Sequence, residues 1–196
     1  MDVEALGALV LAISGHRNQT VALTEDLAKR FPTHTIVRSY WLPTIKAEIS
    51  LHDSRAQEAI DELRASVPFE LGEALSVQAA TCLYPIYLRG EAYLAAGQGS
   101  AAAEEFQKFI DHRGISWNCA NGALAHLQLG RAFALEAGIT PVGGSASAAQ
   151  VAPSASKPAS LARSRAAYQD FFSIWKDADP AIPILKEAKA EYEKLH

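Results

Sequence analysis

This 196-residue chain has few cysteines, no large excess of positive or negative charge, and no long hydrophobic run. Its two cysteines, Cys82 and Cys119, are too few for a disulfide framework and form no CxxC pair of the kind that binds zinc. They are about one helical-repeat length apart, so neighbouring helices can bring them together. We nevertheless expect two buried or half-buried thiols that behave as small apolar residues.

The charge balance excludes another class of protein. The formal net charge is -4, and the lysines and arginines are spread singly along the chain. A nucleic-acid interface needs a cluster of basic side chains to displace counterions, so we expect no nucleic-acid partner.

No segment near the N-terminus has the features of a membrane anchor or a signal peptide. The apolar run at residues 5–13 follows Asp2 and Glu4 instead of basic residues, and it is too short to span a bilayer. The sequence therefore predicts a cytoplasmic protein without membrane insertion.

What the chain has in abundance is helical periodicity. It is 49% hydrophobic and 20% charged, as folded domains usually are. Apolar residues recur every three to four positions in segments rich in Ala, Leu, Glu and Lys, and none alternates with period two. Short polar or glycine-containing turns separate these segments, which is typical of antiparallel helical hairpins. We expect helices within residues 3–13, 21–31, 36–51, 56–63, 83–96, 101–110, 123–137, 161–175 and 184–195.

Two of the hairpins share a motif. A bulky residue is followed by glycine after four positions and by an aromatic residue after three more, in Ile86–Tyr93 and in His126–Phe133. The second helices also match, since Phe106–Ile110 aligns with Tyr168–Phe172. This is the tetratricopeptide (TPR) pattern. The small residues, Gly90 and Gly130, would allow a close approach of the second helix. The aromatic residues Tyr93 and Phe133 would fill the space between neighbouring hairpins.

The repeats predict an all-α fold: a TPR-like superhelix of about four antiparallel hairpins and a C-terminal capping helix, in one domain over residues 1–196. The outer face of this last helix is expected to carry its charged residues, Lys186, Glu187, Lys189, Glu191, Glu193 and Lys194. Pro43 and Pro85 are expected to kink first helices or to mark their starts. A run of Ala, Ser, Gly and Pro at residues 138–160 separates the helices of the fourth hairpin. We interpret this run as a flexible insert.

Five segments of the chain carry a resemblance to a known family: Leu27–Pro32, Tyr84–Leu94, Phe106–Gly114, Gly122–Ala132 and Trp175–Pro180. In these segments the chain is similar to the C-terminal tetratricopeptide region of bacterial eukaryotic-like serine/threonine protein kinases, of the sort common in Acidobacteria.

In that family a kinase domain precedes the repeats, often with a membrane segment between them. The chain contains no glycine-rich loop, no His-Arg-Asp and no Asp-Phe-Gly, so the resemblance does not imply phosphoryl transfer. If the chain is a fragment of such a kinase, the resemblance places it outside the cytoplasm. The insert at residues 138–160 departs from the family's short turn.

No catalytic, metal or cofactor motif is visible. The six histidines form no HxxxH or HExxH, and there is no GxSxG. His126 is expected to pack in the core, and His112 to cap a helix C-terminus. A Cys–His nucleophile built from Cys82 or Cys119 with His126 would depend entirely on the fold.

The function predicted from these features is a non-catalytic scaffold or adaptor that binds another protein or a peptide; a homo-oligomer is also compatible with the sequence. In such arrays the first helices line a concave groove. With Gly90 and Gly130 as registers, the expected binding residues are Tyr84, Tyr87, Glu91, Leu127 and Arg131. Two alternatives stay open: a detached sensory or regulatory domain of a kinase, and an unrecognised hydrolase on a helical scaffold.

Overall fold

The computed structural model describes residues 1–72, 82–116, 119–140 and 157–196, and all regular secondary structure in these ranges is helical. The prediction of an all-α fold is confirmed. The elements are α1 (Asp2–Ile13), α2 (Arg17–Arg30), the π-helical turn η1 (Val37–Trp41), α3 (Leu42–His52), α4 (Ala56–Leu63), the 3-10 turn η2 (Arg64–Ser66), α5 (Tyr84–Ala95), α6 (Gly99–Asp111), α7 (Arg113–Ser116), α8 (Ala120–Glu136), α9 (Lys157–Ile174) and α10 (Pro183–Glu193).

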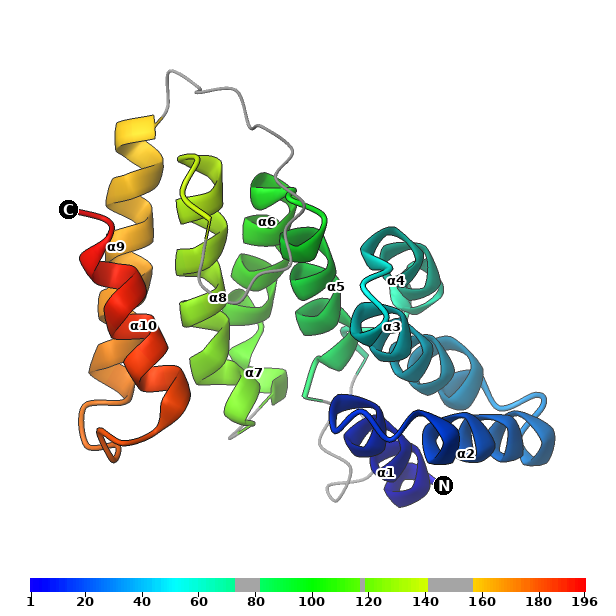
Figure 1. The fold of residues 1–196 in the computed structure, drawn as a ribbon. Helices are drawn as coiled ribbons and strands as arrows, with labels where there is room; N and C mark the ends of the chain where they lie inside the picture. The colour runs from blue at the N-terminus through cyan, green and yellow to red at the C-terminus, as the bar shows by residue number, and fades with distance from the viewer. Residues whose placement is uncertain (73–81, 117–118, 141–156) are drawn as a thin grey trace.

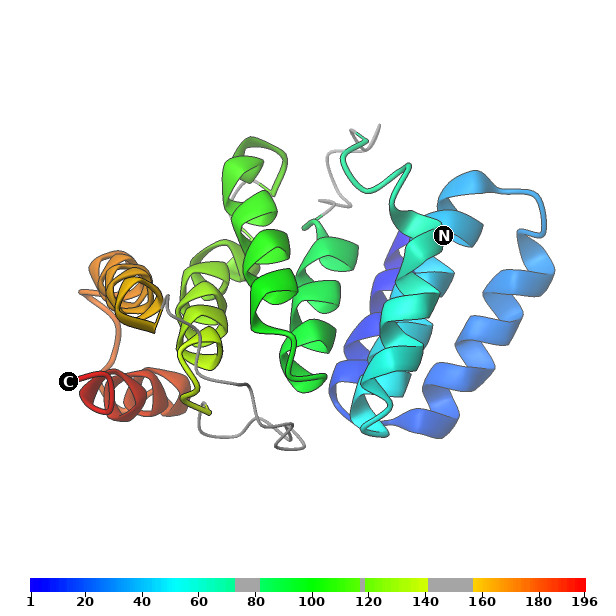
Figure 2. The ribbon, with the colours of Figure 1, turned by 90° about the horizontal axis from the view of Figure 1, so that it is seen from above.

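The helices pack mainly against their neighbours in the chain. α1 pairs with α2, α3 with α4, α5 with α6, and α8 with α9, and successive pairs contact each other through α1 with α3, α4 with α5, and α6 with α8. Figure 1 shows the pairs side by side, and the view from above shows them following one another from the N-terminal pair to α9 and α10 (Figure 2). Buried side chains form three clusters along this row, so the core extends along the stack.

The first helix of every pair ends in the same turn. The second residue after each helix has a positive φ: Gly15 (74°), Ser54 (58°), Gly97 (74°) and Gly138 (81°). In each turn the next amide donates to a carbonyl five residues back, as His16 N does to Leu11 O at 2.8 Å. These are Schellman caps, which favour glycine because a side chain is strained at positive φ. All four hairpins therefore share a turn, including the two whose repeats are least clear in the sequence.

The glycine in the first helix and the aromatic residue in the second helix of the third and fourth hairpins are matched for a steric reason. A Cβ atom added at Gly90 would lie 2.6 Å from Cζ of Phe106, and one added at Gly130 would lie 2.7 Å from Cδ2 of Tyr168. Thus α6 and α9 each rest an aromatic ring on the bare backbone of the first helix of their hairpin, α5 and α8. Tyr93 packs against two of the core clusters, which agrees with its expected place between hairpins.

The prolines mark helix starts. Pro43 lies in the first turn of α3, directly after η1, and Pro85 lies in the first turn of α5. Pro158 also lies in a first turn, because α9 begins at Lys157. The expected insert therefore extends too far: residues 157–160 are helical, since proline is tolerated where its missing N–H has no helical partner. Residues 141–156 of the predicted insert lie outside the described ranges.

Within the described ranges, no helix combines the length and the apolar character needed to cross a bilayer.

Candidate functional site

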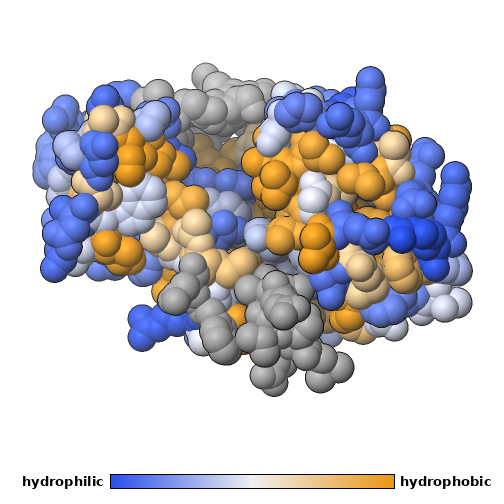
Figure 3. Space-filling view, turned by 90° about the horizontal axis from the view of Figure 1, so that it is seen from below, coloured by the Kyte–Doolittle hydropathy of each residue, from blue (hydrophilic) through white to orange (hydrophobic). Residues whose placement is uncertain are grey.

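One face of the molecule is hollowed between its two halves. Figure 3 shows this face from below, with hydrophilic residues at the base of the hollow and hydrophobic patches on both flanks. A hollow with a polar base and apolar sides offers both hydrogen bonds and apolar contacts to a ligand.

A row of polar side chains connects the first helices to α10. We call it the inner polar row: Glu48 of α3, Glu91 of α5, Gln128 and Arg131 of α8, and Glu187 and Glu191 of α10. Gln128 Nε2 donates to Glu91 Oε1 at 3.0 Å, and Arg131 Nη1 donates to Gln128 Oε1 at 3.4 Å. Arg131 Nε donates to Glu191 Oε2 at 2.9 Å, so one network joins α5, α8 and α10.

Glu191 anchors α10 in this row. Its carboxylate is 4% exposed and also accepts a hydrogen bond from the Tyr168 hydroxyl at 2.9 Å. Burial, and then the Glu191 charge, raise the pKa of Tyr168 well above its usual value. The sequence pattern placed Glu191 among the outward-facing charges of the last helix. That placement is wrong, because Arg131 and Tyr168 supply the buried partners that a carboxylate needs.

Four of the five predicted binding residues lie on or beside the row, and the fifth does not. Glu91 and Arg131 belong to it, and Tyr84 is half-buried one turn before Tyr87 on α5. Tyr87 is 7% exposed and packs edge-on against Phe106 and Phe109, although its hydroxyl accepts a hydrogen bond from Gln128 at 3.4 Å.

Leu127 is fully buried, so its expected place in an exposed groove is wrong. Leu127 and Tyr87 each precede a repeat glycine by three residues. Residues three apart share a helix face, and the second helix covers the face of the glycine. Gln128, the next residue of α8, joins the row instead. Choosing the residue after Leu127 as the groove position of α8 would have identified Gln128.

Glu91 and Glu48 are two carboxylates without an ion pair in the described part of the chain. Burial, and next the charge of Glu48, raise the pKa of Glu91 to about 8, against the hydrogen bond from Gln128 and the charge of Arg131. Burial also raises the pKa of Glu48. At neutral pH most Glu91 side chains therefore carry a proton.

The Glu91→Gln variant is expected to be more stable than the wild type at high pH. Between about 4.5, the pKa expected in an unfolded chain, and about 8, the folded protein holds a proton on Glu91 that the unfolded chain has lost. The stability of the wild type should therefore fall as the pH rises through this window, and glutamine should abolish that loss. We expect the variant's advantage in the free energy of unfolding to grow by about 4–5 kcal/mol from pH 4 to pH 9, the equivalent of the raised pKa of Glu91.

Urea unfolding followed by circular dichroism at several pH values measures this difference. Glu104→Gln is the matched control, because Glu104 is exposed on α6. A constant difference between wild type and Glu91→Gln across the pH series would show that Glu91 titrates normally.

A second hollow, of about 560 Å³, lies over α6 and the facing ends of α8 and α9. Phe133 contributes an aromatic ring, and the Arg163 guanidinium stacks on that ring at 4.2 Å while pairing with Glu136 at 2.7 Å. None of the five predicted binding residues lines this hollow. It is the main competitor of the inner polar row as a binding surface.

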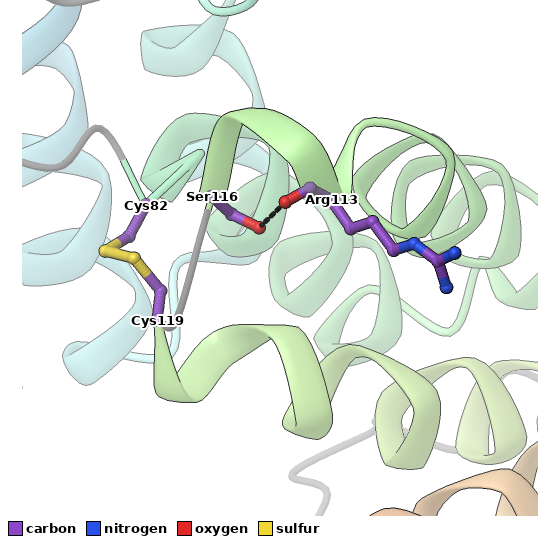
Figure 4. The surroundings of a disulfide bond; sticks show 4 residues. All are labelled: Cys82, Arg113, Ser116 and Cys119. Carbon is purple, nitrogen blue, oxygen red and sulfur yellow. Dashed lines mark hydrogen bonds between the residues drawn. A yellow bond between two sulfur atoms is a disulfide. The ribbon is translucent and has the colours of Figure 1, made fainter.

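A disulfide bond joins Cys82 to Cys119, with their Cα atoms 5.7 Å apart. Cys82 lies just before α5 and Cys119 is the N-cap of α8, so the bridge ties together the starts of two first helices (Figure 4). Beside it, the Ser116 hydroxyl donates to the Arg113 carbonyl at 3.1 Å, and the Arg113 side chain points away. The expectation of two free thiols is wrong, because the helical stack brings residues one repeat apart into contact.

The disulfide also removes the Cys–His nucleophile, since a bonded sulfur cannot attack a substrate. His126 is half-buried, with Nδ1 3.9 Å from Asp170, so it is not a packed core residue. His112 donates from Nδ1 to the Lys108 carbonyl at 2.8 Å, which confirms its capping role. No group of three or more metal-ligating side chains gathers within the described ranges.

Comparison of the chain with protein-family models, with curated proteins and with solved structures gave no match. The resemblance to kinase-linked repeats stays a prediction.

Proposed function

We propose that the protein is a TPR-like scaffold that binds a peptide or a partner protein along the inner polar row. The observation that carries this proposal is the repetition of the first helices. Four of them end in the same cap, and side chains of α5 and α8 form a network that crosses from the third hairpin to the fourth. A ligand lying across the row would contact several helices at once, which is how helical-repeat arrays use their extended surfaces.

The chemistry of the row fits an extended peptide. Tyr84 offers a half-buried aromatic surface at one side, and aromatic and arginine side chains are common anchors at interfaces. Glu187, which is 53% exposed, offers a negative charge to the polar groups of a ligand, and Arg131, which is 12% exposed and bonded to Glu191, lies beneath it.

Selection of a displayed random peptide library against the purified protein tests this proposal. Peptides that bind the wild type would then be measured against Tyr84→Ala and against Phe133→Ala. Both variants remove a half-buried aromatic side chain, the first beside the inner polar row and the second in the hollow over α6. We expect Tyr84→Ala to weaken binding about tenfold or more, and Phe133→Ala to leave it unchanged.

The two variants control for each other, provided that circular dichroism shows both to be folded. Loss of binding with Phe133→Ala alone would assign the ligand to the hollow over α6. Selection of no peptide at all would count against a peptide-binding role.

The disulfide bears on the cellular compartment in which the protein functions. Cytosolic thiols are kept reduced, whereas disulfides persist in oxidising compartments. The bridge between Cys82 and Cys119 therefore favours a protein outside the cytoplasm over the cytoplasmic one predicted from the N-terminal sequence. It also favours the sensory-domain alternative, since kinase-linked repeats beyond a membrane would lie in such a compartment.

A further inference from the structure

Two carboxylates of the inner polar row occupy equivalent positions on neighbouring first helices. Helices α3 and α5 pack against each other, and the rings of Trp41 and Tyr84 meet between them with centroids 6.2 Å apart. Glu48 follows Trp41 by seven residues, and Glu91 follows Tyr84 by seven. Seven residues are about two helical turns, so each carboxylate lies on the helix face that carries the ring. The two carboxylates are therefore neighbours, and the charge of Glu48 raises the pKa of Glu91.

The inner polar row has more hydrogen-bond acceptors than donors. Arg131 is engaged by Glu191 and by the carbonyl of Gln128. The amide nitrogen of Gln128 is engaged by Glu91. In the described part of the chain, no hydrogen bond to Glu48 is formed, and Oε1 of the buried Glu191 has no donor either. Acceptors left without donors are completed by water or by a ligand that brings N–H groups.

The chain supplies no counterion to the two carboxylates among its described residues. Arg131 acts on Glu91 from α8 but has its own buried partner on α10. His52 acts on Glu48 from one turn further along α3, and its ring contacts a backbone carbonyl of α1. Lys46 is exposed on another face of α3. Burial raises the pKa of both carboxylates, so ionising them side by side is costly unless a cation joins them.

We propose that the peptide ligand of the inner polar row places the cationic side chain of a lysine or an arginine between Glu48 and Glu91. This inference rests on the proposed function, peptide binding along that row. An ammonium or guanidinium group brings both the positive charge and the several N–H donors that the row lacks. Both carboxylates are half-buried rather than fully buried, so a side chain can reach them from the surface.

A metal ion fits this position less well than an organic cation. Metal ions of the Ca²⁺ and Mg²⁺ type take six or more oxygen ligands, whereas no three metal-ligating side chains gather anywhere in the described ranges. An acidic ligand is excluded by charge, because the row carries four carboxylates and only one arginine, which is already bonded to Glu191.

The composition of peptides selected from the displayed random library tests this inference. We expect the binders to share a lysine or an arginine at one aligned position. Synthetic peptides with norleucine in place of that lysine, or citrulline in place of that arginine, keep the length of the side chain and lose its charge. They should bind the wild type about tenfold or more weakly than the charged peptide does.

The double variant Glu48→Gln/Glu91→Gln identifies the residues that receive the cation. Glutamine has nearly the shape of glutamate, and its carbonyl can still accept the hydrogen bond from Gln128. The double variant should bind the charged peptide about tenfold or more weakly than the wild type does, and the neutral peptide equally well. Glu25→Gln is the matched control, because Glu25 is an exposed carboxylate of α2, and it should bind both peptides as the wild type does. Circular dichroism checks that both variants are folded.

Three other results would contradict the inference. Selected peptides without a basic residue would overturn it and leave the proposed peptide binding in place. Equal weakening of the charged and the neutral peptide by the double variant would do the same, because the substitutions would then act on the site as a whole. Selection of no peptide at all would overturn the proposed function, and this inference with it.

Discussion

Replacing Glu70 with alanine is expected to lower the free energy of unfolding by about 3–5 kcal/mol. The Glu70 side chain has no exposed surface, and its carboxylate accepts two hydrogen bonds from Arg89, at 2.8 and 3.0 Å. It also pairs with Lys108 of α6. Without Glu70 the buried guanidinium of Arg89 would keep only Glu105, at 2.6 Å, as a partner. The cost comes chiefly from leaving a charge buried and underpaired.

Urea unfolding of Glu70→Ala beside Glu104→Ala measures this effect. Glu104 is exposed on α6, so its replacement should change the free energy of unfolding by less than about 0.5 kcal/mol. If both variants lose the same small amount, the pairing of Glu70 with Arg89 contributes little and the link between α4 and α5 is held by other contacts.

Glu70 illustrates what the sequence alone could not reveal. Arg89 stands directly before the repeat glycine and was visible as part of the motif, but its partner lies 19 residues earlier in a link without periodicity. Pairing between distant residues leaves no local pattern. The same holds for Glu191, whose partner Arg131 is 60 residues away and whose own helix has the charge pattern of a solvated surface.

The helices and their pairing were far easier to predict. Periodic apolar residues and short turns located the helices, because both features act over a few residues. Gly90 and Gly130 were assigned correctly to close helix approach, since their spacing to an aromatic ring recurs. The turn that the four hairpins share could not be recognised from the sequence at one position, where Ser54 adopts the positive φ that glycine has in the other three turns.

The candidate site was predictable from the sequence only in part. The motif register gave the helix face on which Glu91 and Arg131 lie, and the structure joins both to one network. The motif register could not show how deeply each side chain is buried. Whether Tyr87 and Leu127 meet water depends on how closely the second helices cover them, which is a property of the packed array.

The double variant Cys82→Ser/Cys119→Ser is expected to lose about 4 kcal/mol of stability by the loop-entropy model of cross-links. The two cysteines are 37 residues apart, and the closed loop contains α5, α6 and α7. In the unfolded chain the bridge holds this whole hairpin in a loop, so its removal restores conformational freedom to the unfolded state. Cys82 is 9% exposed. Its replacement by serine therefore also leaves a shielded hydroxyl.

Guanidinium unfolding of the wild type with and without a reducing agent separates these two contributions. The reduced wild type should lose most of what the double variant loses, because reduction opens the loop without adding a hydroxyl. The double variant itself should not respond to the reducing agent, which controls for effects of the reagent. If the reduced and oxidised wild types unfold at the same denaturant concentration, the bridge does not restrict the unfolded chain. The argument for an oxidising compartment would then lose its support.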